Sequence, residues 1–492
     1  MIRGFGSYRN TAKLCAIKYT SARKEIPGRP ELVYTVHINM AVSTSADNMN
    51  VFKFTDYDCI GFDLDNTLLR YNVTNLTNME YEMLAKFLVN ERGYSSKHLL
   101  KPLTDDDLDF MQKGLLLDFE KGNLLRVSPD GVIRRACHGS HLLSTDQIRE
   151  FYPEQRWEVT DAFCSDILTT WYGPLSEKVR SLLDYFDMPT SVVFARIVDM
   201  LDEEHGSPLD VYNIWPDILA GLMHMFSREK FQLDDGIFAH IKRNPEKYLR
   251  KCSEKTVSWL REVRKKFPTF LLTGSNADFA NFTASYSLGK DWQSLFDIAI
   301  CFAKKPGFFT MKRPFLKVVN YNETDINISS QDLKRGELYS QGNWSDLLEF
   351  FSRITGKVDQ RCLYVGDNLV QDIYVPNAFG RCDTLAVIEE QMAEGMLYQR
   401  LTHPDEKILN SNLWGSYFCL KDSTINVDSL WGHLIKKHAK LCIPEIDVVT
   451  QKSLQESFPC FDKSGKSYHG YYPAVPLSIS AIYGLYQLSR SN

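Results

Sequence analysis

The apolar run from Cys59 to Phe62 is followed directly by two acidic residues, Asp63 and Asp65. A buried strand with two unpaired carboxylates would be strongly destabilised, because each carboxylate would lose its hydration without gaining a partner. The strand therefore ends at this point, and a bound cation would offset the two negative charges. This pattern places the chemistry of the chain at the end of a buried strand.

Three later apolar runs end in polar residues in the same way, at 269–275 (TFLLTGS), 298–303 (IAICFA) and 361–367 (RCLYVGD). Such runs are typical of parallel strands buried on both faces, and ligands bind at the carboxyl ends of these strands. Helical spacing of apolar residues predicts helices over 254–266 and 345–355, beside these runs. Strands that alternate with helices predict an α/β fold with a parallel sheet.

The chain from Asp65 to Thr273 covers 273 − 65 = 208 positions, far more than one crossover helix needs. This interval therefore contains a domain inserted after the first strand. It begins with a helix at 79–90, continues through a hairpin with a Pro-Asp-Gly turn at 129–131, and becomes mainly helical from about residue 160. We expect this large, mainly helical insertion to cover the carboxyl edge of the sheet as a cap.

These boundaries predict four segments along the chain. They are an N-terminal extension at 1–50, a core at 51–76 and 255–395, a cap at 77–254 and a C-terminal extension at 396–492. We expect the N-terminal extension to be disordered and the C-terminal extension to pack on the core. Residues 1–24 carry six Lys or Arg and no acidic residue, which is typical of a mitochondrial presequence.

Charge and cysteine content argue against several classes of protein. A net charge of −5 gives no electrostatic basis for nucleic-acid binding, and no apolar run approaches the roughly 20 residues of a membrane span. Eleven cysteines without CxxC pairs indicate reduced thiols in an intracellular protein rather than a disulfide framework. We expect a cytoplasmic protein, with a mitochondrial location as the alternative, that acts on a small molecule and binds neither nucleic acid nor membrane.

The acidic residues after the first strand suit phosphoester chemistry. Asp63 could attack phosphorus as a nucleophile, and Asp65 could protonate the leaving oxygen and then deprotonate a water molecule. A carboxylate approaches an anionic phosphate only when a cation bridges them, and Mg²⁺ prefers carboxylate and carbonyl oxygens. The alternative for this pair is a solvated turn at the end of a strand.

The later strand ends supply further groups for such a reaction. The hydroxyl groups of Thr273 and Ser275 could hold phosphate oxygens, and Lys305 could offset charge in the transition state. Asp367 and Asp372 could bind the metal, although Asp372 could instead orient a metal ligand. One acidic pair is a weak signal, whereas four matching strand ends in order are a strong one.

The motifs FDLDNTL, LLTGS, KPGFF and GDNLVQD resemble those of the haloacid dehalogenase-like phosphatases. Within that superfamily, residues 114–139 resemble the cap hairpin of the cytosolic purine 5'-nucleotidase family, and YSQGN at 339–343 is also similar. The likeness extends from about residue 57 to 395, and residues 469–480 resemble the end of a member of this family. The resemblance implies an α/β, Rossmann-like core of the haloacid dehalogenase type with Mg²⁺ as cofactor.

The resemblance also implies roles for single residues. Asp63 would be the nucleophile and Asp65 the general acid and base, with Mg²⁺ on Asp63, the Asp65 carbonyl and Asp367, and with phosphate held by Thr273, Gly274, Ser275 and Lys305. Lys305 fits this role better than Lys304 because it precedes Pro306, as in the family. Related dehalogenases lack the second aspartate, so Asp65 favours phosphoester chemistry.

The nucleoside pocket of the purine nucleotidases maps onto this chain only in part. In those enzymes a Phe and a His sandwich the base, and a Lys six residues later reaches the phosphate; Phe186, His224 and Lys230 fall at similar places. The Arg and Asp that accompany that His are Asp217 and Gly221 here, a departure that affects hydrogen bonding to base edges. For Phe186 the alternative is a packing role, and for Lys230 a place on the surface.

We therefore expect a Mg²⁺-dependent phosphatase that hydrolyses a nucleoside 5'-monophosphate or similar small phosphoester through an aspartyl-phosphate. One alternative is a catalytically quiet scaffold that binds a phosphate ligand or a protein partner. Another is a phosphatase for a non-nucleotide phosphoester. Assembly into a homo-oligomer is compatible with each of these functions.

Overall fold

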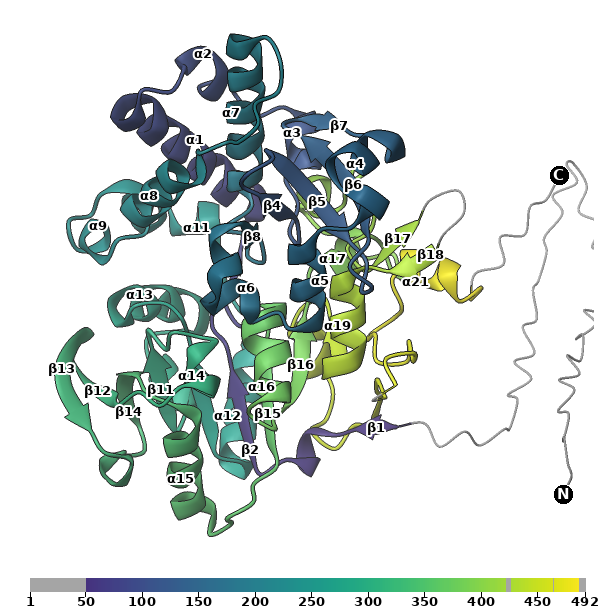
Figure 1. Ribbon diagram of the computed structural model, residues 1–492. Helices are drawn as coiled ribbons and strands as arrows, with labels where there is room; N and C mark the ends of the chain where they lie inside the picture. Colours follow the sequence, from purple (N-terminus) through teal and green to yellow (C-terminus); the bar gives the residue numbers. More distant parts are fainter. Residues whose placement is uncertain (1–49, 422–425, 463, 486–492) are drawn as a thin grey trace, which may run out of the picture. The chain divides into compact units, whose positions relative to one another are not determined.

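A sheet of nine strands forms the core of the computed structural model, which describes residues 50–421, 426–462 and 464–485 (Figure 1). In spatial order the strands are β13 (Asn322–Ile328), β12 (Phe315–Val319), β14 (Glu337–Gln341), β11 (Ile298–Cys301), β10 (Thr269–Leu272), β2 (Cys59–Phe62), β15 (Cys362–Gly366), β16 (Asp383–Val387) and β19 (Ala439–Ile443). From β14 to β19 all neighbours are parallel, whereas β12 and β13 form an antiparallel hairpin at one edge. This arrangement confirms the predicted α/β fold.

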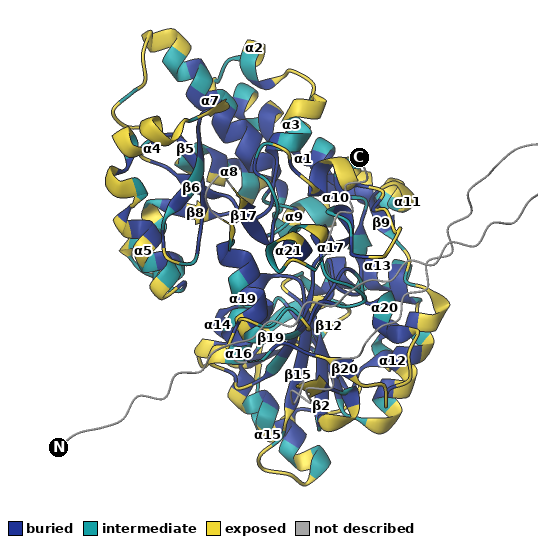
Figure 2. Cartoon of the chain, turned by 90° about the vertical axis from the view of Figure 1, so that its right-hand side faces the viewer, coloured by how far each residue is buried: buried dark blue, intermediate teal, exposed yellow. Residues whose placement is uncertain are grey.

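The four strands predicted from the sequence are neighbours at the centre of this sheet. β2 pairs with β10 on one side and β15 on the other, and β11 lies beyond β10. Every residue of these four strands is buried (Figure 2), as expected for parallel strands covered on both faces. Their carboxyl ends therefore meet at one edge, where the predicted site residues follow them.

Both predicted helices of the core are present, and side chains define their ends. α12 (Glu254–Lys266) begins after Ser253, whose hydroxyl oxygen accepts the Thr256 N–H. α15 (Trp344–Thr355) begins after Asn343, whose side chain accepts the Asp346 N–H, and ends at Gly356 with φ 71°. These caps satisfy backbone groups that a helix leaves unpaired at its termini.

The insertion after β2 forms a cap that combines helices with a second sheet (Figure 1). This antiparallel sheet has the order β7 (His141–Leu142), β6 (Ile133–His138), β5 (Asn123–Val127), β4 (Leu116–Asp118) and β8 (Val179–Ser181). The longer helices are α1 (Val73–Arg92), α7 (Pro189–His205), α8 (Trp215–Met225) and α10 (Gly236–Arg243). The predicted hairpin is β5–β6, and the predicted boundary between residues 76 and 77 falls inside α1.

The sequence led us to expect that the C-terminal segment packs on the core. In the structure this segment also contributes a strand to the core sheet and contacts the cap. Its strand β19 pairs with β16 and becomes the last strand of the core sheet. It also contacts the cap, because the indole of Trp431 donates to the Gly114 carbonyl (2.8 Å) and that of Trp414 donates to the Phe110 carbonyl (2.9 Å). The segment therefore joins the core to the base of the cap.

Most of the predicted N-terminal extension, residues 1–49, lies outside the described residues. Within the described ranges no helix has the length and apolar character needed to cross a bilayer. The ten cysteines of those ranges are free, in agreement with the expected reduced thiols.

Candidate active site

The first strand ends in a turn that presents Asp63 and Asp65 at the carboxyl edge of the sheet. The Asp63 N–H donates to the Val365 carbonyl (2.8 Å) and continues the pairing of β2 with β15 by one residue. The chain then turns at Leu64, whose carbonyl accepts N–H groups from the residues that follow. Asn66 lies in the left-handed region at φ 53°, which asparagine tolerates better than most residues.

Three aspartates from two strand ends gather at this edge. Asp63 follows β2, Asp367 follows β15, and Asp372 lies in a π-helical turn at Leu369–Tyr374. One oxygen from each lies within 4.8 Å of the others, and all three residues are buried. Gly366 permits this approach, since a Cβ at that position would lie 2.4 Å from the Asp372 Cβ. The structure thus brings together the aspartates proposed as metal ligands.

Lys305 is the cation of this group. Its Nζ lies 2.9 Å from Asp63 Oδ1 and 2.6 Å from Asp372 Oδ1, and its side chain is 4% exposed. Lys304 is exposed instead. The structure therefore places the lysine that precedes Pro306, and not its neighbour, against the carboxylates.

The electrostatics of the group favour a further cation. Burial raises the pKa of Asp63 and of Asp367 well above the ordinary value, and the surrounding carboxylates add to both shifts. Burial lowers the pKa of Lys305, but the charges of Asp372 and Asp63 outweigh it and leave that pKa raised. The buried Oδ2 of Asp367 has no hydrogen-bond partner among the described residues. Carboxylate oxygens with an excess of negative charge suit Mg²⁺.

Asp65 faces hydroxyl groups rather than the other aspartates. Its carboxylate accepts hydrogen bonds from Tyr71 (2.7 Å), Ser275 (2.7 Å) and Thr273 (3.3 Å). A Cβ on Gly274 would meet no atom within 4 Å, so space is open beside this loop. Asp65 and the loop Thr273–Ser275, which supplies three of the four residues predicted to bind phosphate, therefore lie together.

The predicted sandwich of a base between Phe186 and His224 stays a prediction, and in this structure each ring contacts other aromatic residues. The Phe186 ring packs edge-on against Tyr71 and Phe226, with centroids 5.1 and 5.8 Å away. His224 is exposed, and its ring lies 5.1 Å from that of Phe87. His224 lies beside, and not on, the buried face of α8 (Trp215–Met225).

Lys230, predicted as a phosphate ligand, forms an ion pair within the cap in this structure. Its ammonium pairs with Asp235 at 2.5 Å, next to it in the cap. A different residue of α9 (Arg228–Gln232) reaches the core, since Arg228 contacts Asp278 at 3.3 Å and Glu323 at 2.6 Å. The cationic contact from α9 to the core is thus made by Arg228, two positions before Lys230.

Two charged cap residues near the site were missed by sequence reasoning. Asp184 accepts a hydrogen bond from Asn66 Nδ2 at 3.1 Å, and burial raises the pKa of Asp184 to about 7. Lys113 pairs with Glu390 of the core at 3.1 Å, and both side chains are 2% exposed. The available signal was a charged residue inside an apolar stretch, SLLDYF at 181–186 and MQKGLLL at 111–117.

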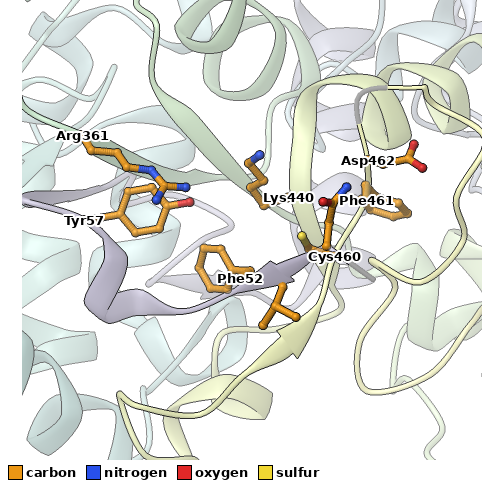
Figure 3. A pocket seen from close by; sticks show the side chains of 9 residues that line it. Phe52, Tyr57, Arg361, Lys440, Cys460, Phe461 and Asp462 are labelled. Carbon is orange, nitrogen blue, oxygen red and sulfur yellow. The ribbon is translucent and has the colours of Figure 1, made fainter. Parts of the chain in front are cut away.

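A separate pocket of about 440 Å³ lies at the opposite edge of the core sheet, near the amino ends of β2 and β15 (Figure 3). Arg361 lies over the Tyr57 ring there, 4.7 Å from its centroid. The nearby carboxylate of Asp383 is already paired with Tyr57 (3.0 Å), Arg361 (3.2 Å) and Lys440 (3.6 Å). This pocket is therefore distinct from the carboxyl edge that holds Asp63.

Comparison with known proteins identifies relatives over most of the chain. A family model described as the 5' nucleotidase family matches residues 49–429. Human 5'-nucleotidase domain-containing protein 1 is 34% identical over 458 residues, which cover 87% of this chain and 98% of the relative. Rat 5'-nucleotidase domain-containing protein 2 is 25% identical over 327 residues, or 66% of this chain and 55% of that protein. These matches confirm the resemblance seen in the motifs.

Among solved structures, a haloacid dehalogenase-like hydrolase from Streptococcus pneumoniae covers 73% of this chain and 93% of its own, at 10% identity and a TM-score of 0.22. A TM-score this low does not establish a common fold. The fold class rests instead on the strand order and on the family match.

Proposed function

Because the chain belongs to the 5'-nucleotidase family of phosphomonoester hydrolases, we propose that it hydrolyses a nucleoside 5'-monophosphate or a similar small phosphoester with Mg²⁺ and an aspartyl-phosphate intermediate. The observation that carries this proposal is the convergence of groups from four strand ends. Asp63, Lys305 and Asp372 form one cluster, and Asp65 with Thr273 and Ser275 forms a second. A nucleophile, a cation, a proton donor and hydroxyl groups are the parts that phosphoryl transfer to a carboxylate requires.

Asp63 is the nucleophile in the proposed reaction. One of its carboxylate oxygens forms a bond to phosphorus as the bond to the leaving oxygen breaks, and Asp65 donates a proton to that oxygen. In the second half, Asp65 takes a proton from a water molecule whose oxygen attacks the phosphorus. The bond to Asp63 then breaks and releases inorganic phosphate, so both aspartates return to their starting states.

The hydroxyl groups around Asp65 couple substrate binding to proton transfer. In this state Thr273 and Ser275 donate to Asp65 Oδ2. A bound phosphate would compete for these two donors, and its binding would leave Oδ2 free to carry the proton for the leaving group. Tyr71 would continue to hold the other oxygen at 2.7 Å, which keeps the carboxyl group oriented.

Asp63, Asp367 and Asp372 would hold Mg²⁺, and the family resemblance adds the Asp65 carbonyl as a further ligand. When bound, the ion supplies positive charge between a carboxylate and the phosphate, which otherwise repel each other. Lys305 contributes a second positive charge from within hydrogen-bond distance of Asp63 and Asp372. Its raised pKa keeps it protonated, so it can offset charge on the phosphoryl oxygens in the transition state.

A non-nucleotide phosphoester is the second candidate substrate, because one observation favours it. Phe186 packs edge-on against Tyr71 and Phe226, and the ring of His224 lies beside that of Phe87. Both rings already have aromatic neighbours, so stacking on a purine would require them to exchange these contacts. We include sugar and polyol phosphates in the proposed substrate range for this reason.

The test is a panel of phosphomonoesters assayed for phosphate release with Mg²⁺ and with EDTA. Nucleoside 5'-monophosphates, glycerol 3-phosphate and phenyl phosphate sample the leaving groups. We expect Mg²⁺-dependent release by the parent and its loss in Asp63→Asn. The matched control is Asp56→Asn, an exposed position before the same strand, which should retain activity. A folded, pure parent that releases no phosphate from any of these esters would overturn the proposal.

A further inference from the structure

Asp184 is a carboxyl group of the cap that lies over the catalytic residues of the core. It precedes α7 and accepts the hydrogen bond from Asn66, the residue directly after Asp65. After burial, the charge of Asp184 is the main cause that raises the pKa of Asp367. The side chain is partly buried. Asp184 therefore contacts the turn that carries Asp65, on the cap side of the catalytic residues.

Buried polar atoms next to Asp184 lack partners. Asn66 is 1% exposed and donates to Asp184 through Nδ2, while its Oδ1 has no hydrogen-bond partner among the described residues. Glu80 of α1 is also 1% exposed, and both its carboxylate oxygens lack partners in the same part of the chain. Its raised pKa, due first to burial and then to Asp184 and Asp187, places it in the same neighbourhood.

Such atoms are costly in a folded protein unless something satisfies them. A ligand with hydrogen-bonding groups on the cap side of the phosphate would do so. Within the described ranges, Asp184 has no Lys, Arg or His partner in an ion pair. Lys113, a lysine near the site, is paired with Glu390 instead. The Asp184 carboxyl can therefore accept a hydrogen bond from a ligand, and its charge would repel a second anionic group.

We propose, on the basis of the phosphatase function above, that Asp184 accepts a hydrogen bond from a hydroxyl or amino group of the leaving alcohol. This contact makes Asp184 a specificity-determining residue. It selects phosphomonoesters whose alcohol carries a further hydrogen-bond donor, nucleosides and polyols among them. It disfavours alcohols that lack such a donor and alcohols that carry a second phosphate.

The experiment compares kcat/KM for three substrates in the full-length protein with Mg²⁺. The substrates are the best donor-bearing ester of the panel, phenyl phosphate, which has no further donor, and a sugar bisphosphate. Asp184→Ala removes the acceptor, and Asp184→Asn keeps an acceptor for Asn66 without the charge. The matched control is Asp187→Asn, a nearby position whose carboxylate pairs with Arg180 at 3.5 Å.

We expect Asp184→Ala to lower kcat/KM for the donor-bearing ester by about 10- to 100-fold, as for a lost hydrogen bond to a charged group. Phenyl phosphate should change by less than about threefold, the bisphosphate should be hydrolysed better, and Asp187→Asn should behave like the parent. If Asp184→Ala does not fold, Asp184→Asn provides the test. For this variant we expect a smaller fall in kcat/KM for the donor-bearing ester and the same gain in kcat/KM for the bisphosphate.

Two results would overturn the inference while the proposed function stands. One is an equal fall in kcat/KM for the donor-bearing ester and for phenyl phosphate in Asp184→Ala. This result would mean that Asp184 only supports Asn66 and its turn. The other is a parent that does not prefer the donor-bearing ester. A parent inactive on all three substrates would instead remove the proposed function, and this inference with it.

Discussion

Mg²⁺ should raise the melting temperature of this protein, and the Asp367→Asn variant should lose that response. Three carboxylates, Asp63, Asp367 and Asp372, share one ammonium group from Lys305, so the cluster has a formal charge of −3 + 1 = −2. One divalent cation balances this charge. Asparagine at position 367 removes one negative charge and replaces a carboxylate ligand by an amide, so the affinity for Mg²⁺ should fall sharply.

The size of the effect follows from linkage between binding and folding. A ligand that binds only the folded state stabilises it by about 2.7 kcal/mol at a free concentration of a hundred times its dissociation constant. An unfolding entropy of roughly 2.1 cal/mol/K per residue amounts to about 1 kcal/mol/K for 492 residues. The melting temperature should therefore rise by about 3 °C.

Thermal unfolding followed by circular dichroism, first in EDTA and then with saturating MgCl₂, measures this shift. NaCl at equal ionic strength separates general screening from binding. The control variant is Asp359→Asn, an exposed position before β15 with the same change in charge, and it should respond like the parent. A rise in Asp367→Asn equal to that of the parent, or no rise in the parent, would refute the proposed metal site.

Three further outcomes are expected. Lys305→Met leaves Asp63 and Asp372 without their buried counter-charge and should lower the free energy of unfolding in EDTA by about 3–5 kcal/mol. Lys304→Met should change it by less than about 0.5 kcal/mol, and equal losses in urea titrations would contradict the assigned pairing. Trp431→Phe removes the donor to the buried Gly114 carbonyl and should cost about 1–3 kcal/mol by the same measurement; an unchanged value would mean that this contact does not join the C-terminal segment to the cap. His438→Gln tests pH dependence. Burial lowers the pKa of His438 to about 4, whereas the unfolded chain has a value near 6.5. The folded state therefore binds this proton less tightly, and the parent should lose up to about 3 kcal/mol relative to the variant as pH falls from 6.5 to 4. Parallel stability curves for the parent and this variant over that range would exclude the effect.

The central part of the fold could be predicted because its signal is local. Each of the four runs that became β2, β10, β11 and β15 is mostly apolar and is followed within a few positions by polar residues. The remaining strands of the core lack this pattern. β13 consists largely of exposed and half-buried residues, and β19 is a short run whose role depends on pairing with β16. Their assignment requires knowledge of which strands become neighbours.

The site shows the same limit. Asp63, Asp65, Thr273, Lys305 and Asp367 follow strands that end at one edge, so their convergence could be inferred without coordinates. The cap residues belong to no strand end, and the tertiary structure alone sets their direction. The pocket roles of His224 and Lys230 therefore stay predictions, and in this structure these residues contact Phe87 and Asp235.

For Asp184 the reason is different, since a single acidic residue in an apolar stretch is a common feature of loops. Its bond to Asn66 joins positions that are 184 − 66 = 118 residues apart. No spacing rule relates two residues at that separation. Only the packing of the cap on the core brings this residue next to the turn that carries Asp65.

The position of β2 between β10 and β15 affects how the protein is made on the ribosome. From Phe62 to Cys362 the chain extends over 362 − 62 = 300 positions, which take about 15–60 s to translate at 5–20 residues per second. During this time β2, a fully buried strand at the centre of the core sheet, has left the exit tunnel without one of its partners. We expect the nascent chain to depend on chaperones until β15 emerges, whereas the cap can begin to collapse earlier.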